Sequence, residues 1–211
     1  MKITSLKQYK GKTYEVELDS QRKLYLHIDI IVDFGLSVGM QIEQNELKKV
    51  VYASNFHRAY QYALYCLDYR DYSAEDMYHK LIKTYKSEKL CLNVIKKLAR
   101  AGLIDDRRYA ERLARKLVES KKYGYRRAKR EIMQKGIDEY IAEDALSKYD
   151  GIYSENLMEL LENKYCRYLT DITDRKSIEK VKNSLVRYGY EFDEINYTVK
   201  EYFNNTEQSE G

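Results

Sequence analysis

Ten basic side chains lie between Arg112 and Lys135, and only Glu119 and Glu131 oppose them within that segment. Ten cations and two anions leave a local charge of +8, whereas the whole 211-residue chain has a formal charge of +4. Cations at this density attract phosphates and acidic protein surfaces. A solvated helix face would also be basic, but this concentration of nearly unopposed charge favours a polyanionic or acidic partner. The candidate binding residues are Arg112, Arg115, Lys116, Lys121, Lys122, Arg126, Arg127, Lys129, Arg130 and Lys135.

Residues that could support catalysis or bind a metal are scattered along the sequence. The three histidines, His27, His57 and His79, are isolated and form no HExxH motif or zinc-type cluster. Asp105-Asp106 could be a carboxylate pair for a metal, but adjacent acids at a helix start are better explained as caps. No phosphate-binding glycine loop, nucleophile elbow or nucleophile–base pair is visible. We therefore expect no enzyme, no metal site and no cofactor.

Two further features also lack the context that chemistry would require. Asp33-Phe34-Gly35 spells the magnesium motif of kinases, but none of the motifs that accompany it in kinases is present. The cysteines at 66, 91 and 166 form no CxxC pair, and the first two read as small buried hydrophobes. Nothing in the cysteine usage points to an oxidising compartment.

The basic run lies on a predicted helix, break and second helix. Apolar residues from Tyr109 to Val118 recur in pairs four apart, which is one stripe of an α-helix. Tyr123-Gly124-Tyr125 breaks the pattern, and the next helix is predicted to turn Ala128, Ile132 and Met133 inward. Gly136 stands where a left-handed cap is needed, and Asp138 caps a third helix.

The first 50 residues have a different pattern. Apolar and polar residues alternate over 14–18 and again over 24–26, and residues 19–22 can form the turn of a hairpin. A third short strand or turn is predicted over residues 28–32. We expect a small β-rich extension over residues 1–50.

The helical pattern repeats three times. Tyr85, Ile137 and Tyr190 each enter the third helix of a unit, and they are 52 and 53 residues apart. The predicted fold is mainly α, with three tandem three-helix repeats that form a curved, elongated array behind the β-rich extension. The predicted boundaries are 51–104, 105–150 and 151–203 for the repeats and 204–211 for a disordered polar tail.

The central stretch resembles a known family. Gly102-Leu-Ile-Asp-Asp106, Tyr109-Ala110, Gly124 and the segment Glu131 to Ile137 together resemble the central motif of the bacterial RecX regulatory proteins. The resemblance covers about residues 50–203, and the β segment is similar to that of Gram-positive members. Met133 departs from the usual Leu, which is a volume-conserving change.

This resemblance implies a modulator of the RecA recombinase. Such proteins bind the helical groove of RecA–DNA filaments, block filament extension, and depress ATP hydrolysis, strand exchange and co-protease activity. Weak, non-specific contacts with DNA phosphates would accompany this binding. Two alternatives stay open: a helix-turn-helix-like nucleic-acid-binding module that acts without RecA, and a helical-repeat protein–protein scaffold.

The location and assembly state follow from weaker signals. The N-terminal residues lack the apolar core of a signal peptide, and the apolar run at residues 28–32 is too short to cross a bilayer. We expect a cytoplasmic protein without membrane contact. No long heptad pattern is present, which favours a monomer.

Overall fold

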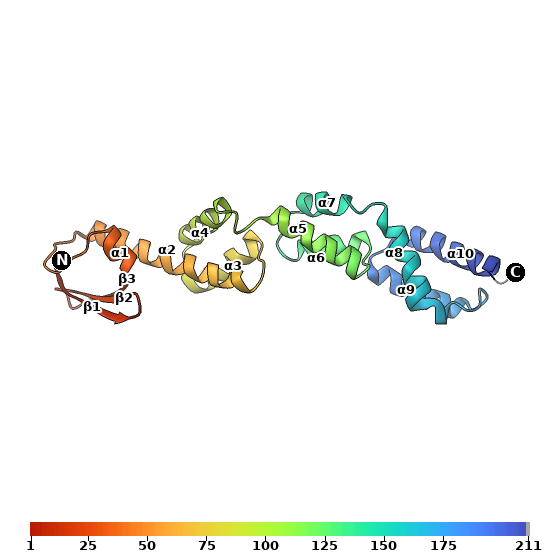
Figure 1. Ribbon diagram of the computed structural model, residues 1–211, viewed down its shortest axis with the longest axis horizontal. Helices are drawn as coiled ribbons and strands as arrows, with labels where there is room; N and C mark the ends of the chain where they lie inside the picture. Colours follow the sequence, from red (N-terminus) through yellow and green to blue (C-terminus); the bar gives the residue numbers. More distant parts are fainter. Residues whose placement is uncertain (210–211) are drawn as a thin grey trace. The chain divides into compact units, whose positions relative to one another are not determined.

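The computed structural model describes the backbone of residues 1–209 and the side chains of residues 1–206 (Figure 1). The chain divides into two compact units. The first comprises Met1–Arg70 and Met77–Leu103, and the second comprises Asp71–Asp76 and the chain from Ile104 onwards. The protein is mostly helical, as predicted. None of the helices in the described part of the chain combines the length and apolarity needed to cross a bilayer.

The first unit begins with a three-stranded antiparallel sheet in the order β1-β2-β3. The strands are β1 (Ile3–Lys10), β2 (Thr13–Leu18) and β3 (Lys23–His27). The predicted hairpin is confirmed as β2 and β3. The sequence did not reveal β1, because it is an edge strand in which only Ile3 is fully buried, so its apolar alternation is faint.

The predicted strand or turn over residues 28–32 is wrong. This segment is a short helix, α1 (Ile28–Asp33), whose N-cap is His27. Ile30 and Ile31 are adjacent and both buried, which a strand with alternating faces does not allow. They join Val16, Leu26 and other apolar residues in the core under the sheet.

Three helices follow the sheet. They are α2 (Gln44–Tyr69), α3 (Ala74–Tyr85) and α4 (Glu88–Arg100). α2 starts six residues before the predicted end of the β-rich extension at residue 50, because Glu43 and Glu46 form a capping box there. Cys66 on α2 and Cys91 on α4 are buried, as expected, and Cys166 is exposed.

The second unit contains two further helix triplets. The first consists of α5 (Asp106–Arg115), which continues into the π-helical turn η1 (Lys116–Ser120), then α6 (Tyr125–Met133) and α7 (Glu139–Ser147). The second consists of α8 (Ile152–Leu160), the turns η2 (Leu161–Tyr165) and η3 (Cys166–Tyr168), α9 (Arg175–Tyr188) and α10 (Phe192–Ser209). One hydrophobic core runs from Tyr109 to Phe203. The segments 105–150 and 151–203 therefore pack as one body, and their division into repeats stays a prediction, as does the curvature of the array.

Two local expectations in this unit are wrong. The segment predicted to be a disordered tail is helical as far as Ser209, because α10 continues without a break, and residues 210–211 lie outside the described chain. Met133, predicted to point inward, is 39% exposed, whereas Ala128 and Ile132 are fully buried. One residue is a rotation of about 100° on a helix, so Met133 lies beside the buried stripe rather than on it.

Candidate functional site

The helix that opens the basic run is fixed by two carboxylates. Asp105 is the N-cap of α5, and its carboxylate accepts a hydrogen bond from the backbone N–H of Arg108 at 3.0 Å. Asp106 accepts from the backbone N–H of Ala74, the first residue of α3, at 2.9 Å. Desolvation by burial raises the pKa of Asp106. The two acids cap two different helices, which supports the cap interpretation over a metal-binding pair.

The start of α6 fits closely against the end of α9. The backbone N–H of Gly124 donates to the carbonyl of Tyr188 at 2.9 Å, and that of Arg126 donates to the carbonyl of Gly189 at 3.2 Å. A Cβ atom on Gly124 would lie 2.5 Å from the carbonyl carbon of Gly189. No side chain therefore fits at residue 124. The free N–H groups of one helix and the free carbonyls of the other satisfy each other.

The cations of the basic run are largely paired, which corrects the expectation that they lack acidic partners. Most of the partners lie outside the run, in segments that only the fold brings near. The ion pairs are Arg112–Asp71 at 2.6 Å, Arg115–Glu119 at 3.9 Å, Lys122–Glu159 at 2.7 Å, Arg126–Glu191, Arg127–Glu131 at 3.7 Å, and Lys129 with both Glu139 and Glu143 at 2.6 Å.

Lys122 mainly supports the fold. Its backbone adopts φ +54°, and its ammonium donates to the side-chain carbonyl of the buried Asn156 at 2.8 Å. Asn156 in turn donates to the backbone carbonyl of Val118 at 3.0 Å. Lys122 thus belongs to a polar network that joins η1 to α8.

Arg127 and Lys129 are also tied into the fold. The guanidinium of Arg127 lies 3.9 Å from the ring centroid of Tyr123 and donates to the backbone carbonyl of Arg187 at 3.0 Å, near the end of α9. Hydrogen bonds from Lys129 to Glu139 and Glu143 raise the pKa of its ammonium and keep it charged. The two carboxylates cancel that charge locally.

Other cations of the run face solvent. Lys116 and Arg130 are exposed, and neither forms an ion pair within the described residues. Lys121 is exposed with its ammonium 5.3 Å from the ring centroid of Tyr123. Lys135 is half-buried, and its backbone carbonyl accepts a hydrogen bond from the hydroxyl of Ser73.

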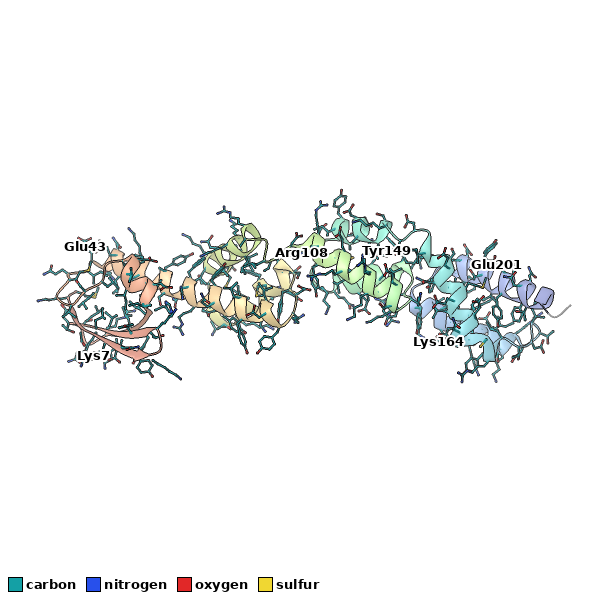
Figure 2. All side chains as sticks on the ribbon, in the orientation of Figure 1. Lys7, Glu43, Arg108, Tyr149, Lys164 and Glu201 are labelled. Carbon is teal, nitrogen blue, oxygen red and sulfur yellow. The ribbon has the colours of Figure 1, made fainter. Side chains whose placement is uncertain are left out.

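One side of α6 combines exposed cations with exposed apolar groups, and Figure 2 shows side chains projecting from this helix. Tyr125 is 37% and Met133 39% exposed. We call this surface the α6 outer face, which is a shallow hollow lined by Tyr125, Arg126, Lys129, Arg130, Met133 and Gln134. Tyr, Met and Arg are the residue types enriched in protein interfaces. The α6 outer face can bind an acidic protein surface, or phosphates through its guanidinium groups.

Sequence reasoning found the cations of this face but not its apolar members. The sequence pattern predicts that Met133 points inward and that Tyr125 is part of the break before the helix. The available signal was the helical spacing, because residue 133 is rotated by about 100° from residue 132 on a helix. With Ala128 and Ile132 buried, Tyr125 and Met133 both lie to the same side of that stripe, on the face that also carries Arg126 and Arg130.

Known proteins match this chain over the same region and beyond it. A family model described as "RecX, second three-helix domain" matches residues 105–146, which include α5, α6 and α7. The crystal structure of RecX from Lactobacillus salivarius is 32% identical, with a TM-score of 0.65, and the match covers 71% of this chain and 97% of that one. The chain belongs to the RecX family. The resemblance of the central motif is thereby confirmed.

Other RecX proteins agree with this assignment. The "Regulatory protein RecX" of Streptococcus sanguinis is 29% identical over 91% of this chain and 73% of its own length. That of Oceanobacillus iheyensis is 24% identical over 95% of this chain and 75% of its own length. A second crystal structure, of a regulatory protein RecX, has a TM-score of 0.74 at 24% identity and confirms the fold. These RecX relatives are named as regulatory proteins rather than as enzymes.

Proposed function

We propose that this chain is a regulator that binds RecA or RecA–DNA filaments and inhibits their extension, ATP hydrolysis, strand exchange and co-protease activity. Membership of the RecX family supports a regulatory role. The α6 outer face is the observation that carries the rest of the proposal, because it lies in the segment that the family model matches.

The chemistry of this face suits a nucleoprotein partner. A RecA–DNA filament offers both phosphates and protein surface within one groove. Arg126 and Arg130 can contact phosphates or carboxylates, while Tyr125 and Met133 can bury apolar area that phosphates alone would not cover. Of the ten candidate cations, Lys116 and Arg130 are the most available members of the proposed contact set, whereas Lys122, Arg127 and Lys129 are held by contacts that support the fold.

The decisive experiment adds the protein to preformed filaments of the cognate RecA on single-stranded DNA and follows ATP hydrolysis. The wild-type chain should slow hydrolysis at sub-stoichiometric amounts. A double variant, Lys116→Glu with Arg130→Glu, should raise the concentration for half-inhibition at least about tenfold, which corresponds to about 1.4 kcal/mol of binding free energy. Both residues are exposed, so each change should alter the free energy of unfolding by only about 0.5 kcal/mol.

The matched control is a second double charge reversal, Lys96→Glu with Arg100→Glu, at exposed positions of α4 in the first unit. This variant should inhibit like the wild-type chain. Arg127 and Lys129 are unsuitable for reversal because their contacts support the fold. Unchanged hydrolysis at a molar excess of wild-type protein would reject the regulator proposal and favour the protein–protein scaffold.

A nucleic-acid-binding module that acts without RecA is the second candidate. It is favoured by Lys116 and Arg130, which are exposed and form no ion pair with any residue that the structure describes. Such a module would bind bare DNA through phosphate contacts without sequence preference. Binding to DNA by a chain that leaves RecA filaments unaffected would support this second candidate. For both candidate functions we propose that the protein acts as a monomer in the cytoplasm.

A further inference from the structure

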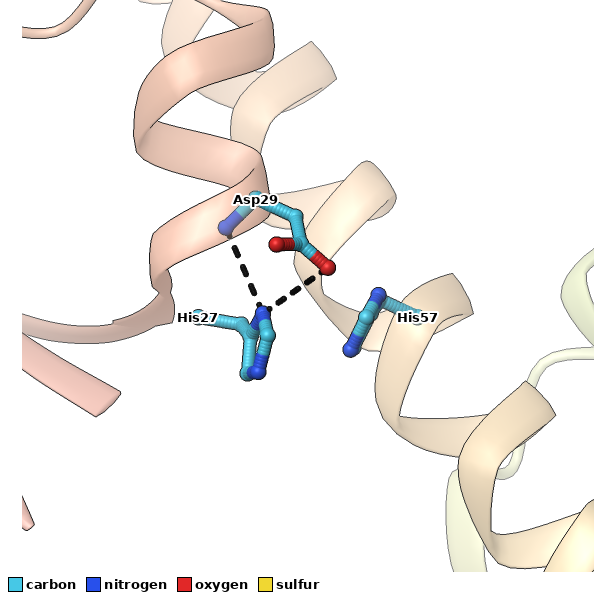
Figure 3. Close-up of side chains that lie close together, drawn as sticks. All are labelled: His27, Asp29 and His57. Atoms are coloured by element: carbon cyan, nitrogen blue, oxygen red, sulfur yellow. Dashed lines mark hydrogen bonds and ion pairs between the residues drawn. The ribbon is translucent and has the colours of Figure 1, made fainter. Parts of the chain in front are cut away.

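Three side chains that are distant or unremarkable in the sequence converge in the first unit. His27 ends β3, Asp29 lies in the first turn of α1, and His57 projects from α2 toward both of them (Figure 3). The two imidazole rings stack with their centroids 4.4 Å apart and an interplanar angle of 23°. One potential ligand atom from each residue lies within 4.8 Å of the other two.

Two hydrogen-bond acceptor atoms, one from His27 and one from Asp29, lie close together in this cluster. The backbone N–H of Asp29 donates to Nδ1 of His27 at 3.3 Å, so this nitrogen carries a lone pair in that arrangement. The bond is longer than the usual range of about 2.7–3.2 Å and therefore holds the lone pair weakly. The carboxylate Oδ2 of Asp29 lies 3.2 Å from the same nitrogen. Two acceptor atoms at this distance need a cation between them, which is either a proton or a metal ion.

One of the three ligand separations already fits a zinc ion. Zn–N and Zn–O bonds of about 2.0–2.1 Å in tetrahedral geometry place neighbouring ligand atoms about 3.3–3.4 Å apart. The 3.2 Å between Nδ1 of His27 and Oδ2 of Asp29 is close to this value. The other ligand atoms lie up to 4.8 Å apart, so these distances would have to shorten by at most about 1.4 Å on zinc binding. Modest rotations of half-buried and exposed side chains can supply this change.

The surroundings admit an ion and limit how tightly it is held. The three residues line a hollow of about 760 Å³ that is open to solvent, so the ion could enter and keep water as a further ligand. Lys12 and Arg58 line the same hollow, and their positive charges weaken the attraction for a cation.

We propose that His27, Asp29 and His57 form a binding site for a divalent transition metal, with Zn²⁺ the best fit. An ion held there would fasten the end of the sheet and α1 to α2. The sequence predicted no metal site, because His27 and His57 are 30 residues apart and match no ligand motif. This inference is independent of the proposed function, since the α6 outer face belongs to the second unit.

Calorimetric titration of Zn²⁺ into the full chain tests the site, in a Cys166→Ser background that removes the exposed thiol. The expected result is one Zn²⁺ per chain, and Co²⁺ should give a visible absorption band typical of nitrogen ligation. His57→Gln and His27→Asn should each weaken binding at least about tenfold, because even the loss of a group that only orients a ligand costs about 10- to 100-fold. Asn at residue 27 can still cap α1.

His79→Gln is the matched control, because His79 is the remaining histidine and lies on α3 outside the cluster. This variant should bind Zn²⁺ like its parent. In proton NMR spectra, Zn²⁺ should shift the imidazole signals of His27 and His57 but not those of His79. Asp29→Asn, at an exposed position, provides a third ligand test if a histidine variant does not fold. Absence of binding by the parent chain, or equal loss in His79→Gln and His57→Gln, would overturn the proposal in favour of a proton-bridged His–Asp pair.

Discussion

At the scale of single residues, the contacts of each side chain decide whether it supports the fold or remains available. Lys122 and Arg130 carry the same charge in the same basic run. Lys122 donates to Asn156 and pairs with Glu159, whereas Arg130 is exposed and has no ion pair within the described chain. The first is a structural residue and the second a candidate contact. Local charge density cannot make this distinction.

Two buried tyrosines test how much a single side-chain hydrogen bond stabilises the fold. The hydroxyl of Tyr190 donates to the backbone carbonyl of Lys122 at 2.9 Å, whereas the buried hydroxyl of Tyr153 has no hydrogen-bond partner among the described residues. Burial raises the pKa of both phenols, so both stay neutral at physiological pH. Tyr190→Phe removes a hydrogen bond, and we expect it to lower the free energy of unfolding by about 0.5–1.5 kcal/mol.

Tyr153→Phe is the matched control. It removes the same atom from a site where that atom is desolvated without a partner, so stability should be unchanged or slightly higher. Urea unfolding followed by circular dichroism measures both variants. Equal losses in the two would mean that the hydroxyl of Tyr153 has a partner, such as a water molecule, and the contrast would fail.

At the scale of secondary-structure elements, a close fit in the second unit joins α6 to the turn between α9 and α10. Gly124 and Gly189 are in contact there. A side chain at either position would clash with the neighbouring segment. Gly189 has φ +96° and is the left-handed cap of α9. The two glycines explain how helices from different triplets can share one core.

The prediction at this scale is that Gly189→Ala destabilises the protein. An L-residue in the left-handed region costs about 1–2 kcal/mol. The added Cβ would also lie 2.4 Å from the Cβ and backbone nitrogen of Arg127, and overpacking of this kind costs about 1–3 kcal/mol. We therefore expect a loss of at least about 2 kcal/mol in the free energy of unfolding, measured by urea titration.

Gly151→Ala is the control for this change. Gly151 has φ −78°, and a Cβ there would meet nothing within 4 Å, so the effect should stay within about 1 kcal/mol. If both variants lose a similar amount of unfolding free energy, the close approach of α6 and α9 is not the reason that residue 189 is glycine.

At the scale of the whole molecule, charge is distributed unevenly over the chain. Residues 57–104 carry 9 basic and 5 acidic side chains, residues 105–150 carry 13 and 10, and residues 151–211 carry 8 and 12. The net charges are +4, +3 and −4. A partner rich in phosphate should therefore meet the first two segments, and the acidic segment supplies ion-pair partners such as Glu159 and Glu191 to the basic one.

Salt dependence tests this distribution. Binding of bare DNA should be weak, independent of sequence, and reduced by salt with a log–log slope of about −0.7 to −0.9 per phosphate neutralised. Lys116→Glu with Arg130→Glu should make the slope shallower by about two phosphates, measured by fluorescence anisotropy over a salt series. An unchanged slope would place the phosphate contacts on other cations. Retention of full RecA inhibition by the same variant would move the search for the filament contact to the acidic segment or the N-terminal sheet.

Features that depend on a few neighbouring residues are predictable from the order of amino acids. The helices, the β2–β3 hairpin and the Asp105 cap were predicted from periodicity and turn chemistry. Gly102, Gly136 and Gly189 all adopt the positive φ expected of helix ends. Such features form within one or two turns of chain, so local rules contain the necessary information.

Which distant groups meet depends on how the helices pack, and local patterns do not contain this information. Lys122 pairs with Glu159, and Arg126 pairs with Glu191, across 37 and 65 residues of chain. His57 reaches His27 from another element, and Met133 is exposed while the Ala128/Ile132 stripe of its short helix is buried against α5 and α7. These contacts depend on how helices pack, and a periodic pattern fixes the buried stripe of a helix but not the partner that covers it. The candidate contacts on α6 and the histidine cluster are therefore products of packing.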